Sequence, residues 1–237
     1  MGLTTLFHFV EGETRTNMKI IDPDNHTNTD INEPGVTVSE EILEKLLEEL
    51  LAKVTKEDIV VISGSMPKGS PKDTYYTWTK AFREKGAKVI LDADGDLLKA
   101  GLKASPYLIK PNNHDLGALT GRALETPEEI AETAAELMKE YGIGKVVVSM
   151  GGDGAVYVTK DKTIYAEGLK VPVGSTVGAG DSVVAALAVS EEEGKTLEET
   201  VRLSTAVGAA NVMCSGTQAA EYEVVETLLP KVVFRTI

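Results

Sequence analysis

The sequence contains one cysteine, three histidines and no apolar run long enough to span a membrane. The single cysteine, Cys214, excludes an internal disulfide and is typical of a reducing compartment, so we expect a cytoplasmic protein in which this thiol is buried. His8, His26 and His114 are too scattered to form a metal site, and we expect His114 to lie at the surface. The start of the chain shows no signal-peptide pattern.

An excess of positive charge is also absent. Lys and Arg total 24 against 37 Asp and Glu, which gives a formal net charge of −13. This balance argues against nucleic acid as a partner, because nucleic acids are bound through basic surfaces. A phosphorylated substrate can still be held by a few focused cations and backbone N–H groups, so single Lys and Arg residues inside motifs are informative.

From about residue 57 onward, short apolar segments alternate with amphipathic ones. The expected strands are 58–63, 88–92, 107–110 and 145–149, and the expected helices begin at Ser70–Pro71 and at Thr126–Pro127. Tyr75, Trp78 and Phe82 recur on one face of the first helix. Strands this apolar, separated by helices, predict an α/β fold with a mostly parallel sheet buried on both faces.

The two ends of the chain depart from this pattern. Toward the end, 155–158 and 163–166 predict a hairpin, followed by helices at about 181–190 and 197–213. At the start, 14–22 and 27–31 flank turn-forming residues and predict a β-ribbon. An amphipathic helix over 39–54 follows, with Ile42, Leu46, Leu50 and Val54 on one stripe. We therefore divide the chain into a β-ribbon, residues 1–35, and an α/β domain, residues 36–237.

The loop from Gly174 to Ser182 carries the strongest chemical signal. Small residues at Gly178, Ala179 and Gly180 let backbone N–H groups approach a phosphoryl group at a helix N-terminus, which favours negative charge. Asp181 would repel that group, but it is well placed if it accepts a proton from an attacking hydroxyl. A helix capped by Asp after a tight turn explains the spacing equally well.

The pattern Thr-x-Gly-Ala-Gly-Asp-Ser at 176–182 resembles the C-terminal signature of the ribokinase-like sugar kinases, also called the PfkB family. The resemblance covers about residues 2–236, with the family's motifs in their usual order. It implies a three-layer α/β/α fold with a small β lid. It also implies that Asp181 is the catalytic base and that the N–H groups of 178–180 form an anion hole for the transferred phosphoryl group.

Two segments resemble the sugar-phosphate site of the phosphofructokinase branch. Ser63-Gly-Ser-Met-Pro67 is similar to the family's Ser-Gly-Ser-Leu-Pro turn, which implies substrate binding by Ser63 and Gly64. Gly12-Glu-Thr-Arg-Thr-Asn17 and Asp30-Ile-Asn-Glu-Pro-Gly35 are similar to the lid strands, which implies that Arg15 binds the phosphate already on the sugar. An Arg on a β-ribbon is otherwise most often simply solvated.

Lys110-Pro-Asn-Asn-His-Asp115 is similar to the family's Lys-Pro-Asn-x-x-Glu segment. The resemblance places Lys110 and Asn112 near the nucleotide, and Asn112 and Asp115 near Mg²⁺, which they hold through water. Asp115 stands where the family has the longer Glu. A strand ended by proline and followed by an Asx turn accounts for the same residues.

Ser149-Met-Gly-Gly-Asp-Gly154 is similar to the loop that lines the family's nucleotide site, although such loops often only link a strand to a hairpin. This resemblance adds Ser149, Gly151 and Gly154 to the expected ATP-binding residues, together with Thr176 of the signature.

The family normally begins with a strand that carries a substrate-binding Asp and with a Gly-Gly-x-Gly-x-Asn segment, and neither occurs in this sequence. On that ground we expect exposed sheet edges, and ATP binding with weak or absent sugar-phosphate turnover.

The resemblance implies ATP-dependent phosphorylation of a sugar phosphate with Mg²⁺, most closely that of fructose 1-phosphate to fructose 1,6-bisphosphate. A tagatose-6-phosphate kinase, and a nucleotide-binding remnant without turnover, remain alternatives. We expect a homodimer that forms through the ribbon, with no membrane partner.

Overall fold

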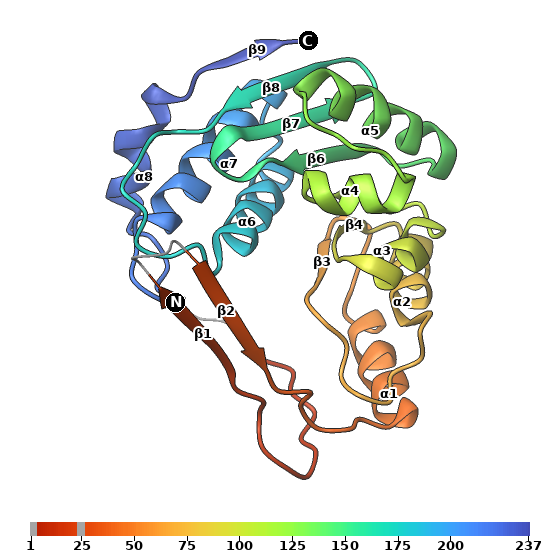
Figure 1. Cartoon of the computed structure of the whole chain (residues 1–237). Coiled ribbons are helices and arrows are strands. Elements are labelled where there is room, and N and C mark those ends of the chain that lie inside the picture. Colours follow the sequence, from red (N-terminus) through yellow and green to blue (C-terminus); the bar gives the residue numbers. More distant parts are fainter. Residues whose placement is uncertain (1–3, 23–26) are drawn as a thin grey trace.

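The computed structural model describes residues 4–22 and 27–237, and its main feature is a seven-stranded sheet (Figure 1). In order across the sheet the strands are β3 (Ile59–Ser63), β4 (Lys88–Asp92), β5 (Leu108–Ile109), β6 (Lys145–Ser149), β7 (Gly154–Thr159), β8 (Thr163–Glu167) and β9 (Phe234–Thr236). Strands β3 to β6 are parallel, and β6 to β9 pair antiparallel. The predicted α/β sheet and the predicted hairpin, β7 and β8, are confirmed.

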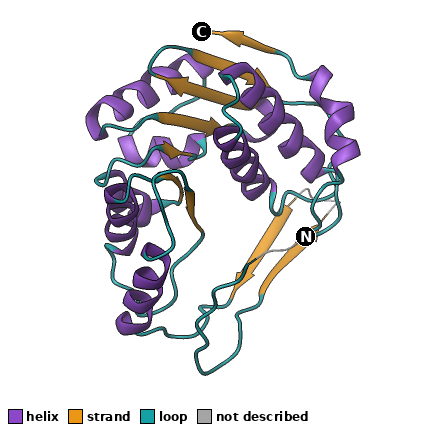
Figure 2. Ribbon diagram, turned by 180° about the vertical axis from the view of Figure 1, so that it is seen from behind, coloured by secondary structure: helices purple, strands orange, loops and turns teal. Residues whose placement is uncertain are grey.

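Helices cover both faces of this sheet (Figure 2). They are α1 (Glu40–Leu51), α2 (Thr74–Glu84), α3 (Gly95–Leu102), α4 (Asn113–Thr120), α5 (Pro127–Tyr141), α6 (Ala179–Glu192), α7 (Leu197–Val212) and α8 (Tyr222–Leu228). Successive strand residues face opposite ways, so Val89 and Leu91 pack in the core that holds α2 to α5, and Ile90 packs with α6 and α7. The result is a three-layer α/β/α arrangement.

Burial of the sheet is complete in its middle and weaker at one edge. Val89, Ile90 and Leu91 of β4 are fully buried, which agrees with a strand covered on both faces. In β3, which forms one edge of the sheet, Val61 is 42% exposed. None of the helices within 4–22 and 27–237 is long and apolar enough to cross a membrane.

The two predicted helix starts differ in outcome. Helix α5 begins as expected, because Thr126 and Glu129 form a reciprocal capping box around Pro127. The prediction for α2 was wrong: the helix begins at Thr74, three residues after Pro71. The Ser70 hydroxyl donates to the carbonyl of Pro67 over 2.8 Å, so it closes a turn and caps no helix.

The buried stripe of α1 also differs from the prediction. Leu43 is the buried residue of this helix, and Leu47, Leu50 and Val54 pack against the core. The predicted stripe advances by four residues at every step, and each such step turns about 40° around the helix. The residues that face the core advance by four, three and four, which keeps them on one face. Leu50 and Val54 of the predicted stripe are therefore confirmed as core-facing, whereas Leu43 and Leu47 take the places predicted for Ile42 and Leu46.

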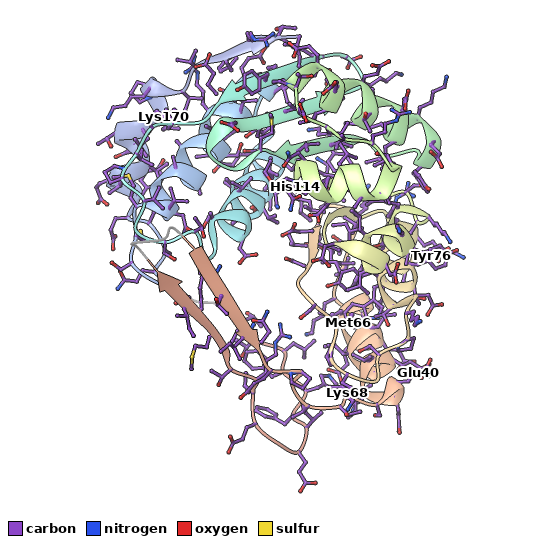
Figure 3. The ribbon with its side chains drawn as sticks, viewed as in Figure 1. Glu40, Met66, Lys68, Tyr76, His114 and Lys170 are labelled. Carbon is purple, nitrogen blue, oxygen red and sulfur yellow. The ribbon has the colours of Figure 1, made fainter. Side chains whose placement is uncertain are left out.

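The predicted β-ribbon is confirmed as a separate two-stranded sheet of β1 (Asn17–Asp22) and β2 (Thr27–Asn32), paired antiparallel. The predicted turn at 23–26 lies outside the described residues. The chain after the ribbon is fixed to the loop that follows β3, where Figure 3 labels Met66 and Lys68. Val38 N donates to Lys68 O over 3.0 Å, and Thr37 and Lys68 form a parallel bridge.

A shielded ion cluster lies at the amino ends of the strands. Glu191, from the last turn of α6, accepts hydrogen bonds from Lys88, Lys145 and Tyr107, which lie at the starts of β4, β6 and β5. Burial of Glu191 raises its pKa, but the hydrogen bonds from Lys145 and Tyr107 outweigh it, and the pKa of this carboxyl lies below its ordinary value. The cluster ties the end of α6 to three strands.

We expect Glu191→Gln to lower the free energy of unfolding at neutral pH by about 1–3 kcal/mol, because it leaves two ammonium groups short of a charged partner. The stabilisation by a carboxylate with a lowered pKa is fully present above the pKa of the unfolded chain. This stabilisation is lost as the pH falls through the lower pKa that the carboxyl has in the folded state. Urea denaturation at pH 7 and in mild acid measures the free energy of unfolding of both proteins. If the difference between wild type and variant does not become smaller in acid, the prediction is wrong. Glu192→Gln, the exposed neighbour, is the control.

Candidate active site

The parallel strands β3 to β6 end at one edge of the sheet, and predicted site residues from separate motifs lie at that edge. Ser63 is the last residue of β3 and Ser149 is the last residue of β6, while Lys110 directly follows β5. Ligands in open α/β sheets bind at the carboxyl ends of the strands. This edge is therefore the candidate site.

An ion pair and a hydrogen bond join side chains at the ends of β3, β4 and β5. Lys110 Nζ lies 3.1 Å from Asp92 Oδ1, and the hydroxyl of Ser63 donates to Asp92 Oδ2 over 3.3 Å. The Lys110 side chain is 8% exposed and that of Asp92 17%, so the ion pair is largely shielded from water. The ammonium group of Lys110 is thus held at the carboxyl ends of the parallel strands.

Helix α6 begins beside this ammonium group. Gly178 is its N-cap, with φ of 79°, a conformation that glycine adopts without strain. Ala179, Gly180 and Asp181 form the first turn, and the N–H groups of a first helical turn are available to an anion. A Cβ built on Gly180 would lie 3.5 Å from Lys110 Nζ, and Asp181 is exposed. The arrangement combines a cation, a helix N-terminus and an accessible carboxylate.

The loop that precedes α6 is held against the end of α7. Gly174 N donates to Val212 O over 2.7 Å, and a Cβ on Gly174 would lie 2.6 Å from Cys214 O, so only glycine fits there. Thr176, further along the loop, is exposed. The prediction that Cys214 is buried was wrong, because this residue is half-buried.

The turn after β5 brings two predicted motifs together. Asn112 Oδ1 accepts from Asp115 N over 2.7 Å and caps α4, so the Asx turn is present. Asn112 also forms a parallel bridge with Ser149. Asp115 is half-buried in the first turn of α4, and His114 is exposed, as predicted (Figure 3).

The glycine-rich loop after β6 is a single 3₁₀ turn, Gly151–Asp153, that leads into β7. Gly154 has φ of 116°, and a Cβ there would overlap the carbonyl oxygen of Ala166 in the neighbouring strand. At Gly151 a Cβ would meet no atom within 4 Å, so that part of the backbone borders open space. Gly154 therefore shapes the turn, and Gly151 leaves room beside it.

The ribbon segment reaches the end of β3 through Arg15. Its Nη2 donates to Ser65 Oγ over 2.7 Å, next to the predicted substrate residues Ser63 and Gly64, all of which are exposed. Tyr75 anchors this turn, because its hydroxyl donates a hydrogen bond to Gly64 O over 2.6 Å. Burial, with the nearby charges of Asp92 and Asp94, raises the pKa of Tyr75 to about 12, so it stays a neutral donor.

The family model described as pfkB family carbohydrate kinase matches residues 2–223. This chain belongs to the pfkB family. It is 37% identical over 232 residues to the 1-phosphofructokinase of Haemophilus influenzae, a match that covers 98% of this chain and 74% of the relative. The 1-phosphofructokinase of Bacillus subtilis is also 37% identical, with 98% and 74% covered. The crystal structure of phosphofructokinase-2 from Escherichia coli in complex with potassium superposes with a TM-score of 0.84 at 31% identity, covering 92% of this chain and 71% of that one.

As a member of the pfkB family, this chain is an ATP-dependent sugar-phosphate kinase, and the fold expected from the sequence is confirmed. Two buried or shielded polar residues of the pfkB kinase escaped the sequence analysis. Asp92 ends an apolar strand, and its partners come from other motifs, so only its place at a strand end could have drawn attention to it. Asn211 lies inside α7, and its buried Oδ1, which has no hydrogen-bond partner in the described part of the chain, lies 3.8 Å from a Cβ built on Gly178.

Proposed function

We propose that this chain transfers the γ-phosphoryl group of ATP to the free primary hydroxyl of fructose 1-phosphate, giving fructose 1,6-bisphosphate. The observation that carries the proposal is the exposed Asp181 in the first turn of α6, beside the shielded ammonium of Lys110. The names of the curated relatives, both 1-phosphofructokinases, favour this sugar phosphate over others.

Asp181 acts as the general base in this proposal. Its carboxylate accepts the proton of the sugar hydroxyl while that oxygen bonds to the γ-phosphorus and the bond to the β,γ-bridging oxygen breaks, so that ADP leaves. The N–H groups of Gly178, Ala179 and Gly180 stabilise the charge on the transferring group. Their helix N-terminus favours negative charge at that place.

The nucleotide lies along the carboxyl edge of the sheet in this proposal. Lys110 contacts its phosphates, and the backbone and side chains of Asn112, Ser149, Gly151, Gly154 and Thr176 line the rest of its site. The support is positional: Asn112 and Ser149 form a bridge, a Cβ on Gly151 would meet no atom within 4 Å, and Thr176 is exposed.

Magnesium neutralises the nucleotide phosphates when it is bound. Asn112 and Asp115 would hold it through water, since Mg²⁺ prefers oxygen ligands and keeps several waters. Asp115 fits that indirect role, because it offers a half-buried carboxylate whose backbone N–H is bonded to Asn112.

Residues 1–35 act as a lid in this proposal. Arg15 binds the phosphate already on the sugar, and Ser63 and Gly64 contact the sugar itself. The hydrogen bond from Arg15 to Ser65 supports this, because it places the guanidinium at the end of β3. A guanidinium binds phosphate through two parallel hydrogen bonds and thereby orients the hydroxyl at the other end of the sugar.

An ADP-release assay with fructose 1-phosphate, tagatose 6-phosphate, fructose 6-phosphate and no sugar tests the proposal. We expect the highest kcat/KM with fructose 1-phosphate. A higher value with tagatose 6-phosphate assigns the chain to that sugar instead. ATP binding without transfer to any sugar phosphate contradicts the proposed activity and agrees instead with the expectation of weak or absent turnover drawn from the absent Gly-Gly-x-Gly-x-Asn segment. The cytoplasmic location stays a prediction from the single cysteine.

We also propose that two copies of the chain pair through the ribbon. Met18 and Ile31 are opposite one another in its register, Ile20 lies on the same face, and these side chains are 50–55% exposed. An apolar face of this kind, on a two-stranded sheet with open edges, favours pairing.

Ile20→Lys is therefore expected to shift the protein from dimer to monomer, because it places a charge in the apolar face. Light scattering at assay concentration measures the mass. Val233→Lys, at an exposed apolar residue outside the ribbon, should leave it unchanged. A wild-type monomer rules out the dimer.

A further inference from the structure

Asp92 has a position that the proposed chemistry does not yet use. It is the last residue of β4, between the ends of β3 and β5. One carboxylate oxygen holds Lys110 and the other accepts from Ser63. Ser63 and Asp92 are also Cα partners in the parallel register, so the backbone fixes their separation.

The ammonium group of Lys110 is in an unfavourable place without Asp92. It is shielded from water, and burial disfavours a charged lysine. It also lies beside the N-terminus of α6, where the helix dipole repels a cation. Within the described residues, Asp92 is the one carboxylate that forms an ion pair with it. The carboxylate therefore keeps the charged nitrogen at the helix end before any phosphate arrives.

The other oxygen of Asp92 connects this position to the sugar side of the site. Ser63 belongs to the turn in which Ser65 meets Arg15. Contacts therefore run from that turn through Ser63, Asp92 and Lys110 to the start of α6.

We propose that Asp92 is a positioning residue, which holds Lys110 against the start of α6 for the transferring phosphoryl group and fixes that position relative to the sugar site through Ser63. The inference rests on the proposed function. Lys110 would touch the phosphoryl group, whereas Asp92 acts through Lys110. Loss of Asp92 leaves the ammonium present but free to move, so the transfer step suffers more than nucleotide binding.

A double-mutant cycle tests the coupling. We expect Asp92→Asn to lower kcat at least about tenfold, the scale on which small misplacements act, with the KM for ATP within about threefold. Lys110→Met should lower kcat at least as much. In the Lys110→Met background, Asp92→Asn should cost less than about threefold more, because residues that act as a unit are not additive. If the loss of kcat in the double variant equals the product of the losses in the two single variants, the residues act independently and the proposal is wrong.

The matched control is Asp96→Asn, which removes the same charge from an exposed carboxylate in the first turn of α3. It should keep kcat within about twofold, because the charge of an exposed carboxylate is screened by water and salt. Ser63→Ala is a milder variant in case Asp92→Asn fails to fold. It should lower kcat by about threefold or more with the KM for ATP within about threefold and, where Asp92→Asn folds, by nothing further in that background. A loss of equal size in both backgrounds contradicts the link to Ser63.

A side-chain ¹⁵N spectrum gives a readout that does not depend on turnover. The Lys110 ammonium signal, assigned as the one that Lys110→Met removes, should be visible in wild type and lost in Asp92→Asn but retained in Asp96→Asn. If wild type transfers no phosphate to any sugar, the proposed function fails while this spectrum still decides whether Asp92 holds Lys110. Retention of the signal in Asp92→Asn overturns the positioning role.

Discussion

Replacing Asp181 with asparagine should lower kcat by about 10²-fold or more, the usual scale for loss of a general base. Asparagine has nearly the same size, and the N-cap of α6 is Gly178, with no side-chain cap hydrogen bond, so the helix start and its N–H groups should be kept. The affinity for ATP should therefore stay within about threefold, since the anion hole is intact. Initial rates over a range of both substrates, with calorimetric titration of ATP, measure the two effects.

The control for this variant is Glu192→Gln, which removes one negative charge from an exposed residue at the other end of the same helix. It should leave kcat unchanged. Near-normal turnover by Asp181→Asn would exclude Asp181 as the base. A large fall in ATP affinity would show instead that the residue shapes the nucleotide site.

Replacing Arg15 with alanine should raise the KM for the phosphorylated sugar by about tenfold or more, as expected for the loss of a charge-assisted, two-pronged contact to phosphate. The KM for ATP should hardly change, because Arg15 meets the turn after β3 and not the loop before α6. Arg15→Lys should fall between wild type and alanine, since an ammonium group keeps the charge but loses the planar fork.

The control for Arg15 is Lys45→Ala, an exposed cation on α1. It tests whether any lost positive charge raises the KM for an anionic sugar. If Arg15→Ala and Lys45→Ala behave alike, the effect is long-range and the lid contact is not needed. If the KM for ATP rises instead, the ribbon belongs to the nucleotide side of the site.

The sequence allowed the central sheet to be predicted because its strands are short, β-branched and ended by Gly or Pro. Val146, Val147 and Val148 are all buried, as a run without alternation requires. Elements with weaker patterns were missed. Helices α3 and α4 have eight residues each, too few for a clear period, and β9 has three residues near the chain end.

The start of α2 shows why a local signal can mislead. Ser70 and Pro71 have the chemistry of a helix start, but the bridge between Thr37 and Lys68 holds the preceding loop in place, and the helix begins only at Thr74. The Ser70 hydroxyl bonds to the carbonyl of Pro67 in that loop, and the partner that holds the loop, Thr37, lies far away in the sequence.

The residues of the site were predictable where a motif is continuous, as from Gly178 to Asp181, and not where partners come from different strands. Asp92 bonds to residues 18 and 29 positions away, and only the parallel register brings them together. The roles of the predicted residues remain proposals, which the variants above test.

The half-buried thiol of Cys214 gives this protein a built-in attachment point for a reporter dye. It is the sole cysteine of the sequence, so a maleimide fluorophore labels one position without removal of others. Its own carbonyl oxygen lies against Gly174, at the start of the loop that leads into α6. A dye on this residue therefore monitors that loop directly. We expect its emission in stopped flow to report the arrival of the nucleotide as a phase separate from the chemistry.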